Sequence, residues 1–254
     1  MGSSSAFTVG LLHALYALQG VMPAKRQLAL ESIHIEQNMI KETVGAQDQC
    51  TAAYGGLNHL IFKKGGEIEV RPLILPRSRL QEFNDHQMLF YTGIMRTASV
   101  VAKSYVDNIE ANHKLFMQMQ EMVEKGISIL QSNKDIYNFG ELLHEAWTVK
   151  QSLSSKVTNS FVNDIYERAR RSGAIGGKVT GAGGGGFLLL FVPPSERKSV
   201  REELSELLHV PFRFDSNGSQ IIFYDPYEED YSHIEMDRTK RNIQSFREMS
   251  ILKD

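Results

Sequence analysis

The residues from Lys178 to Phe187 read Lys-Val-Thr-Gly-Ala-Gly-Gly-Gly-Gly-Phe, and five of the six positions 181–186 are glycine. Glycine has no Cβ, so such a run lets the backbone adopt positive φ and brings N–H groups close to an anion. The apolar run 187–192 follows directly and ends at Pro193-Pro194, which is typical of a fully buried strand. The stretch predicts a phosphate or oxyanion cradle at the edge of a sheet. A flexible hinge or a tight corner stays open as an alternative, because a glycine motif alone is a weak signal.

Composition limits the classes of partner. The 254 residues include 42% hydrophobic and 23% charged residues, which is an ordinary globular balance and enough for two packed cores. The net charge of -2 shows no excess of basic residues of the kind that nucleic-acid-binding proteins carry, so we expect a small-molecule substrate and no nucleic-acid partner. A single cysteine, Cys50, excludes an intramolecular disulfide and a multi-cysteine zinc site. The first residues resemble neither a signal peptide nor a membrane span, so we expect a cytoplasmic protein with no membrane partner.

The chain starts with Gly2-Ser3-Ser4-Ser5-Ala6 and continues into a helical pattern over residues 7–19. Serines are strong N-caps, and a glycine-serine loop that feeds a helix presents free N–H groups and the positive dipole end to a phosphate. A capped helix that binds nothing is the alternative. The helix is apolar around nearly its whole circumference, so we expect it to be buried on most sides.

Two carboxylates follow in the next segments. Glu36 lies near the end of a second predicted helix, over residues 24–41, and Asp48 lies in a predicted polar loop, over residues 43–49. Taken alone, Glu36 also fits a solvated helix-face acid and Asp48 a turn or cap residue. A hairpin is predicted over 57–62 and 67–75.

The second half of the chain alternates strands with helices, which predicts an α+β domain after a polar boundary at residues 76–86. A charge-rich tail follows, with an exposed helix expected at 237–248. The expected strands are 87–92, the segment that contains Lys178, 187–192 and 220–224, the last preceded by a hairpin turn at 217–219, and the expected helices are 100–125, 138–153, 159–172 and 195–208.

Three separated motifs resemble those of the GHMP kinases. Gly2-Ser3-Ser4-Ser5-Ala6 is similar to the second half of the family's phosphate loop, Gly45-Ala46-Gln47-Asp48-Gln49 resembles the loop with the catalytic aspartate, and residues 178–187 resemble the third, glycine-rich motif. Residues 45–49, 90–93 with Arg96, and 176–178 most resemble the D-glycero-D-manno-heptose 7-phosphate kinases. The resemblance covers about residues 1–225.

This resemblance implies an α+β two-domain fold. It comprises a partial ribosomal-protein-S5-like ATP-binding domain over residues 1–80 and a ferredoxin-like domain over 87–225, followed by the tail 226–254. The implied reaction transfers the γ-phosphoryl group of ATP, with Mg²⁺, to a sugar phosphate, and Lys150 is a further candidate for binding that phosphate. The implied roles are ATP binding for Gly2, Ser3, Ser4 and Ser5, metal binding for Ser4 and Glu36, catalysis for Asp48, and substrate binding for Arg96, Lys178, Thr180, Gly181, Ala182, Gly183 and Gly184.

The family's first motif and the first half of its phosphate loop would precede Met1, so we expect an N-terminally truncated sequence. A chain of this kind could self-associate, for example as a homodimer through residues 1–80, and lack turnover. A non-catalytic member that binds nucleotide or a partner, and another activity of the family such as fucokinase or mevalonate kinase, are the competing hypotheses.

Overall fold

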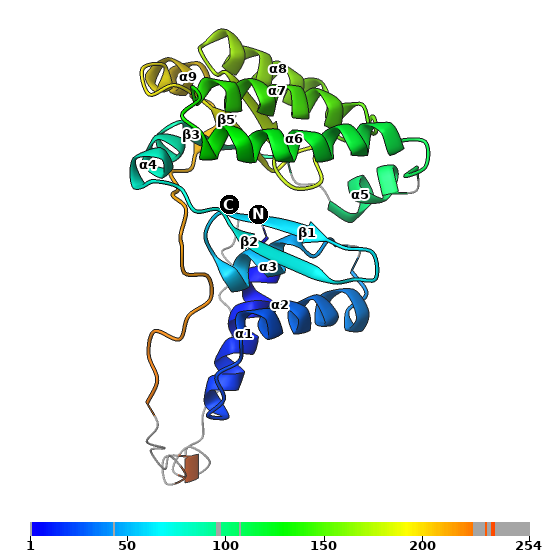
Figure 1. The fold of residues 1–254 in the computed structure, drawn as a ribbon, viewed down its shortest axis with the longest axis vertical. Helices are drawn as coiled ribbons and strands as arrows, with labels where there is room; N and C mark the ends of the chain where they lie inside the picture. Colours follow the sequence, from blue (N-terminus) through cyan, green and yellow to red (C-terminus); the bar gives the residue numbers. More distant parts are fainter. Residues whose placement is uncertain are drawn as a thin grey trace, which may run out of the picture. The chain divides into compact units, whose positions relative to one another are not determined.

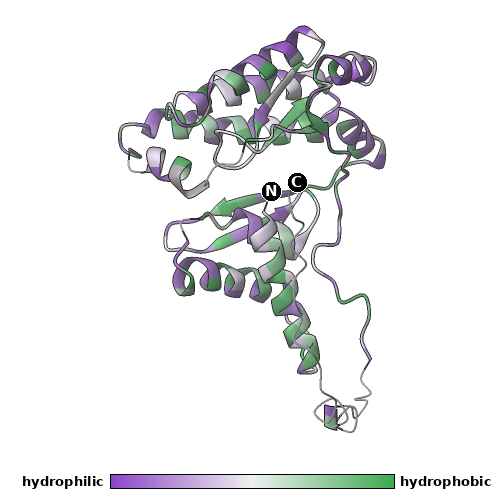
Figure 2. Ribbon diagram, turned by 180° about the vertical axis from the view of Figure 1, so that it is seen from behind, coloured by the Kyte–Doolittle hydropathy of each residue, from purple (hydrophilic) through white to green (hydrophobic). Residues whose placement is uncertain are grey.

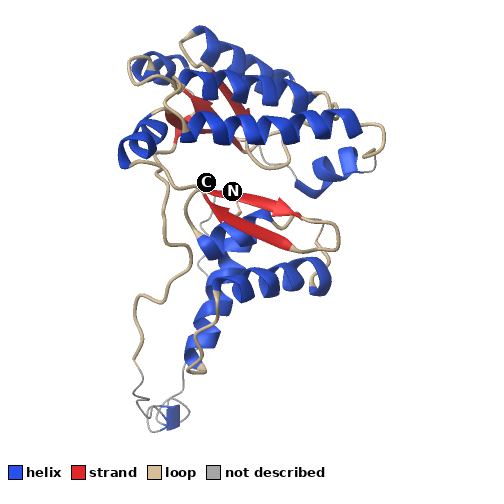
Figure 3. Cartoon of the chain, in the orientation of Figure 1, coloured by secondary structure: helices blue, strands red, loops and turns tan. Residues whose placement is uncertain are grey.

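The computed structural model describes residues 2–42, 44–94, 98–106, 108–225, 232 and 235–236. The chain divides into one unit over Met1–Gln220 and a second over Ile221–Asp254. Helices and strands both contribute to the first unit, so the fold is α+β, as predicted (Figure 3). The helix expected at 237–248 lies outside the described residues.

The first 75 residues form three helices and a hairpin (Figure 1). The helices pack around a small core of Val9, Leu28, Cys50 and Ala53, against which Leu60 of the hairpin also packs. The elements are α1 (Ser3–Leu18), α2 (Lys25–His34), α3 (Gln47–Tyr54), β1 (Asn58–Phe62) and β2 (Ile68–Pro72). The predicted helix over residues 7–19 and the hairpin are confirmed, and the helix predicted over 24–41 is confirmed as far as His34; α3 was not predicted, because residues 43–49 were expected to form a loop.

The expectation that α1 is buried on most sides is wrong for this structure. Only one stripe of the helix, Ser5, Val9 and His13, is buried, because these residues repeat every four positions and so share a face. Most residues outside this stripe are apolar, and much of the helix is green in Figure 2. Four large apolar side chains remain exposed, with Phe7 at 69%, Leu11 at 46%, Leu15 at 47% and Leu18 at 82%.

A short π-helical turn, η1 (Ile35–Met39), continues α2. The Ile40 N–H donates to the Ile35 carbonyl at 2.9 Å, a five-residue step that inserts one residue into the helix. Single π turns of this kind are frequent at functional sites, and this one carries Glu36. The sequence predicted a continuous helix here.

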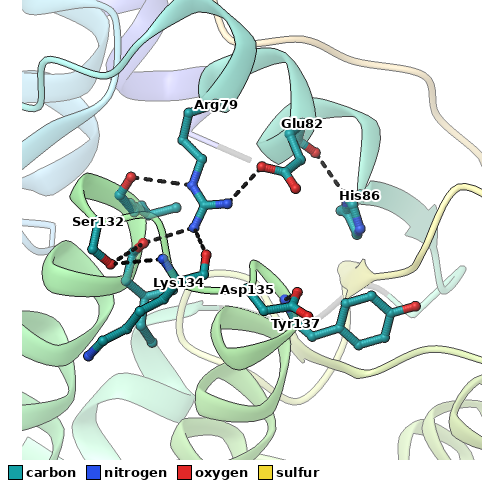
Figure 4. A network of polar contacts seen from close by, with 9 residues as sticks. Arg79, Glu82, His86, Ser132, Lys134, Asp135 and Tyr137 are labelled. Atoms are coloured by element: carbon teal, nitrogen blue, oxygen red, sulfur yellow. Dashed lines mark hydrogen bonds and ion pairs between the residues drawn. The ribbon is translucent and has the colours of Figure 1, made fainter.

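The predicted boundary at residues 76–86 is a helix, α4 (Arg77–Asp85), and Arg79 ties it to the end of α6 (His113–Gln131). Figure 4 shows the network: the Arg79 guanidinium donates to the carbonyls of Ile129 at 2.9 Å and Lys134 at 2.8 Å, and to the Glu82 carboxylate at 2.7 Å. The last carbonyls of a helix have no partner within the helix, so Arg79 supplies a donor at this end, beside Ser132 Oγ, which also donates to the Ile129 carbonyl at 3.3 Å.

The second half forms a four-stranded antiparallel sheet in the order β4-β5-β3-β6. If these four strands are numbered 1 to 4 in the order of the sequence, their order in the sheet is 2-3-1-4. Helices connect strand 1 to strand 2 and strand 3 to strand 4. This is the ferredoxin-like pattern expected from the resemblance. The strands are β3 (Gln87–Tyr91), β4 (Gly176–Val179), β5 (Phe187–Phe191) and β6 (Leu208–His209).

Alternate residues of β3 and β5 build the main core. Met88 and Phe90 lie with Leu188 and Leu190 on one face of the sheet, where Trp147 of α7 packs against them. The period-two pattern of strands explains this arrangement. The remaining helices are α5 (Ala98–Val106), α7 (Tyr137–Gln151), α8 (Ser160–Arg171) and α9 (Arg197–Glu203).

Two helix predictions in this half are wrong. The single helix expected at 100–125 is two helices, α5 and α6, and Asn112 stands at the start of the second, since asparagine favours turns and caps over helix interiors. The helix expected at 195–208 is only α9, and its last predicted residue begins β6.

The strand expected at 220–224 is absent from the sheet, and Ile222 is 94% exposed. The preceding residues 217–219 form no hairpin turn; instead the Ser219 N–H donates to the Ala52 carbonyl at 2.9 Å, and Lys25 Nζ donates to the Asn217 carbonyl at 2.8 Å. These contacts hold the segment against the C-terminal end of α3. In the described part of the chain, no helix is both long and apolar enough to cross a membrane.

Candidate functional site

The start of α1 carries a backbone shape that only glycine adopts readily. Gly2 caps the helix with φ 53°, and a Cβ at this position would lie 3.2 Å from Cγ of Asp48. The expected serine cap is therefore wrong: the capping residue is Gly2, and Ser3 is already the first helical residue. The carboxyl group of Asp48 therefore lies directly against Gly2.

Asp48 lies in the first turn of α3 and not in the predicted loop. An acidic side chain there is favourable, because the free N–H groups and the dipole of a helix N-terminus stabilise negative charge. Two helix N-termini, those of α1 and α3, thus flank the Gly2–Asp48 contact.

Glu36 is 2% exposed and is held by three donors. Ser5 Oγ donates to Oε2 at 2.9 Å, Thr8 Oγ1 donates to Oε1 at 3.0 Å, and Gln49 Nε2 also donates to Oε2. A buried carboxylate is tolerated only when such bonds replace its hydration. The reading of Glu36 as a solvated surface acid is therefore wrong.

Two of these donors, Thr8 and Gln49, were missed by the sequence analysis. Thr8 lies one helical turn after the serines of α1, so its hydroxyl projects from the same face, and it also donates to the Ser4 carbonyl at 3.0 Å. Gln49 follows Asp48 directly and is fully buried, with its Oε1 unpaired. The spacing Ser-x-x-Thr on the first helix was the available signal.

The oxygen groups at this site are of the chemical type that a magnesium ion takes as ligands. Magnesium takes oxygen ligands and is commonly bound by one or two carboxylates together with phosphate oxygens. Glu36 supplies a carboxylate fixed by its three donors, and Ser4 supplies an exposed hydroxyl on the first turn of α1. The structure brings Ser5, and not Ser4, into hydrogen-bond contact with Glu36. Within the described residues, no three His, Cys, Asp or Glu side chains cluster as a protein-only metal site would need.

The glycine-rich loop joins β4 to β5 and is fixed at several points. Thr180 closes its neck, since both its N–H and its hydroxyl donate to the Phe187 carbonyl, at 2.9 and 3.1 Å. The Gly184 N–H donates to the Val157 carbonyl at 2.6 Å, and Asn159 Nδ2 donates to the Gly184 carbonyl at 3.0 Å. The loop is therefore an ordered structure in this protein and not a free hinge.

Glycine is required at two of its positions. Gly183 has φ 112° and a Cβ there would lie 2.6 Å from the Val157 carbonyl oxygen, while a Cβ at Gly185 would lie 2.7 Å from Ile94. Contacts this short do not occur between real atoms, so any side chain would displace the loop.

Lys178 on β4 and Lys150 on α7 lie beside this loop. Lys150 is only 9% exposed and donates to the Gly181 carbonyl. Burial, and then the neighbouring charge of Lys178, lower the pKa of Lys150 to about 7, and burial also lowers the pKa of Lys178. Arg96, the other cation expected here, lies outside the described residues.

Comparison with known proteins identifies the family. Models of the GHMP kinases N-terminal and C-terminal domains match residues 1–56 and 125–210, together more than half of the chain. A D-glycero-alpha-D-manno-heptose 7-phosphate kinase of Campylobacter jejuni is 27% identical over 80% of this chain and 61% of that protein. A mevalonate kinase of Pyrococcus furiosus is 27% identical over 78% of this chain and 57% of that protein. A bifunctional fucokinase/GDP-fucose pyrophosphorylase of Arabidopsis thaliana is 25% identical over 81% of this chain and 20% of that protein.

Solved structures share the fold. The structure of a D-glycero-D-manno-heptose 1-phosphate kinase from Bacteriodes thetaiotaomicron has a TM-score of 0.63 at 23% identity and covers 88% of this chain and 64% of that one. The structure of L. major mevalonate kinase in complex with R-mevalonate has a TM-score of 0.65 at 18% identity and covers 87% of this chain and 67% of that one. The chain thus spans about three fifths of the length of the first curated relatives it matches, apart from the much longer bifunctional one. Because both family models match in order on an α+β fold with the three motifs in place, this chain belongs to the GHMP kinase family.

Proposed function

We propose that this protein is an ATP-dependent kinase that transfers a γ-phosphoryl group to a sugar hydroxyl. The observation that carries the proposal is the buried Glu36 carboxylate, held by Ser5, Thr8 and Gln49 at the start of α1. Glu36 is thus a fixed carboxylate at the start of α1, and Asp48 contacts Gly2 at the same end of that helix, so oxygen donors and helix N-termini that suit phosphates and a cation meet there. Phosphoryl transfer requires a site of this kind, because its rate depends on the positioning of the reacting groups and on neutralisation of the phosphate charge.

In this proposal each residue has a defined part. The N–H groups of residues 2–5 donate to the ATP phosphates, as helix N-termini do for anions. The Ser4 hydroxyl and the Glu36 carboxylate hold Mg²⁺, which neutralises phosphate charge when bound. Ser5 and Thr8 keep Glu36 oriented. Asp48 orients the acceptor hydroxyl or takes its proton.

For the acceptor we propose D-glycero-D-manno-heptose 7-phosphate, phosphorylated at its anomeric hydroxyl. The support is the Gly45–Gln49 sequence, the Phe90–Gly93 stretch and the similarity to the Campylobacter jejuni kinase. The similarity to fucokinase and mevalonate kinase sequences makes fucose and mevalonate the acceptors to compare.

The role of Asp48 is tested by Asp48→Asn in the full-length protein. Turnover, measured as ADP release in a coupled assay, should fall by about 100-fold or more, because general-base catalysis contributes roughly 10² to 10⁴ in rate. Binding of Mg-ATP, measured by calorimetry, should stay within about threefold, since the charge acts on the acceptor. The exposed Asp85→Asn on α4 is the matched control. A variant at position 48 that keeps more than about a tenth of the wild-type kcat contradicts the assignment.

The acceptor is tested by comparing kcat/KM for heptose 7-phosphate, unphosphorylated heptose, fucose and mevalonate. We expect the phosphorylated heptose to be preferred, because a site with buried donors rejects a substrate that leaves them unpaired. Equal kcat/KM for heptose and heptose 7-phosphate would refute the acceptor class, while ADP release with fucose or mevalonate alone would reassign it within the family.

A further inference from the structure

A small cavity lies where the end of α4, the first residue of β3 and the start of α9 meet (Figure 1). Its volume is about 190 Å³, less than the roughly 300–1,000 Å³ of pockets that hold drug-sized ligands. Gln87, which lines the cavity, pairs with Phe191 at one end of β5. The glycine-rich loop joins β5 at its other end, where Phe187 pairs with Tyr91. At about 3.4 Å per residue these two ends are about 13 Å apart, so the cavity is separate from the site described above.

Two guanidinium groups, those of Arg197 and Arg213, line this cavity. Arg197 Nη1 donates to the Asp85 carbonyl at 2.7 Å and to the Gln87 carbonyl at 2.8 Å. A guanidinium has five N–H donors, so those on Nε and Nη2 of Arg197 stay without an acceptor in the described part of the chain. Among the described residues, no carboxylate forms an ion pair with either arginine.

The charge around the cavity is positive. Burial, and then the charge of Arg201 on α9, lower the pKa of Arg197, although the carboxylate of Asp85 acts in the opposite direction. Burial and the same two arginines lower the pKa of His209, which also lines the cavity and is therefore neutral at pH 7.5. The Asp85 carboxylate already accepts a bond from Gln81 Nε2 at 2.7 Å. Three cations and one carboxylate thus lie at this place, which favours an anion as ligand.

Gln87 gives an independent indication of a ligand. The residue is only 6% exposed, and it lines the cavity. Its backbone carbonyl accepts from Arg197, but within the described chain its side-chain amide has no hydrogen-bond partner. Buried polar groups in proteins are normally hydrogen-bonded, and an amide offers two N–H donors and an acceptor oxygen. These groups are available to a molecule in the cavity.

We propose that this cavity binds a small oxyanion, either a phosphate or a carboxylate, between Arg197 and Arg213, with the Gln87 amide as a further donor. Guanidinium groups form paired N–H···O bonds with both kinds of anion, and such charge-assisted bonds are roughly twice as strong as neutral ones. The proposal does not depend on the kinase reaction, because none of these residues has a part in it. Phosphate and carboxylate share the chemistry that the cavity recognises, and the experiment separates them.

The experiment is a titration of the full chain, with its histidines labelled with carbon-13, at pH 7.5. Inorganic phosphate and malonate are the two probes, added separately, and chloride at equal ionic strength is the reference. The readout is the NMR signal of the Cε1–H group of His209, which is assigned by its loss in His209→Gln. We expect a shift that saturates with at least one probe: phosphate alone identifies a phosphate site, malonate alone a carboxylate site, and both a general oxyanion site.

Two variants test the residues that carry the proposal. Arg213→Met should weaken the apparent affinity about tenfold or more, as loss of a charged hydrogen bond does. Gln87→Met should weaken it about threefold, as loss of a neutral hydrogen bond does. Arg26→Met, at an exposed arginine of α2, is the matched control and should leave the affinity unchanged.

Thermal unfolding in chloride alone separates binding from a structural role of Gln87. Gln87→Met should melt no lower than the wild type, because the buried amide has no protein partner to lose. An amide that supports the fold would instead give a variant that melts lower. Arg213 is exposed, so Arg213→Met keeps the test decisive if Gln87→Met fails to fold. A His209 shift no larger than that with chloride for both probes, or an affinity that Arg213→Met leaves unchanged, overturns the proposal.

Discussion

Replacement of Glu36 tests the organisation of the site through stability as well as activity. Glu36→Leu removes the acceptor of two buried donors, Ser5 Oγ and Gln49 Nε2, while a side chain of similar volume remains. The partly buried Thr8 Oγ1 also loses Glu36 but keeps its bond to the Ser4 carbonyl. A buried donor without an acceptor costs about 1–3 kcal/mol, so the two together should lower the free energy of unfolding by about 2–6 kcal/mol. This is a large part of the roughly 5–15 kcal/mol by which domains are stable.

Glu36→Gln separates the hydrogen bonds from the charge. The new amide keeps one carbonyl oxygen for the hydroxyl of Ser5 or Thr8, and its NH₂ group can donate to Gln49 Oε1, which has no partner in the structure. We therefore expect a loss of only about 1–2 kcal/mol. In the full-length enzyme the same variant should raise the magnesium concentration needed for half-maximal activity, because the metal loses a charged ligand.

Chemical unfolding followed by far-UV circular dichroism and by fluorescence is the assay. The only tryptophan of the sequence, Trp147, lies in the core of the second half, so fluorescence reports that half while circular dichroism reports all helices. Glu36→Leu should lower the circular dichroism midpoint more than the fluorescence midpoint. Glu42→Leu, at an exposed acid six residues on, is the control. Equal stability of Glu36→Leu and wild type would refute the account of Glu36 as a hydrogen-bonded centre.

Three further predictions concern other parts of the chain. Arg79→Met should lower the free energy of unfolding by about 2–4 kcal/mol, because carbonyls at the end of α6 lose their donor, whereas the exposed Arg77→Met should have little effect; equal midpoints in urea would contradict this. The pKa of Lys150 lies near 7 in the folded chain against 10.5 for an ordinary lysine, so the unfolded chain binds more protons between these values and the free energy of unfolding should rise with pH there; melts from pH 6.5 to 9.5 should show this rise, and Lys150→Met should reduce it, leaving the part due to Lys178, whose pKa burial also lowers. The exposed apolar side chains of α1 should cause self-association, and the double substitution Phe7→Gln and Leu11→Gln should reduce it. A wild-type monomer in size-exclusion chromatography with light scattering would contradict this prediction.

Local patterns in the sequence determined most of the elements and the family. The apolar run at 187–192 and the proline pair after it were sufficient to predict β5, because period and length report local structure directly. The hairpin at β1 and β2 followed from two β-rich runs around Gly65-Gly66. The glycine-rich loop could be predicted because its glycines are required: at positions such as Gly183, which lies against Val157, a side chain would not fit. A structural need of this kind is visible in the sequence as a run of glycines.

The tertiary structure alone decided which side chains meet. The hydrogen bond between Ser5 and Glu36 joins residues that are 31 positions apart in the sequence, and so does the one between Lys150 and Gly181. No local sequence pattern carries information over such a separation. The two-residue strand β6 and the return of residues 215–219 to α3 are set by pairing with distant backbone and not by their own propensities. Periodicity indicates that a face is apolar, but only the fold decides whether that face is covered, and so α1 could be predicted as a helix while its exposed stripe could not.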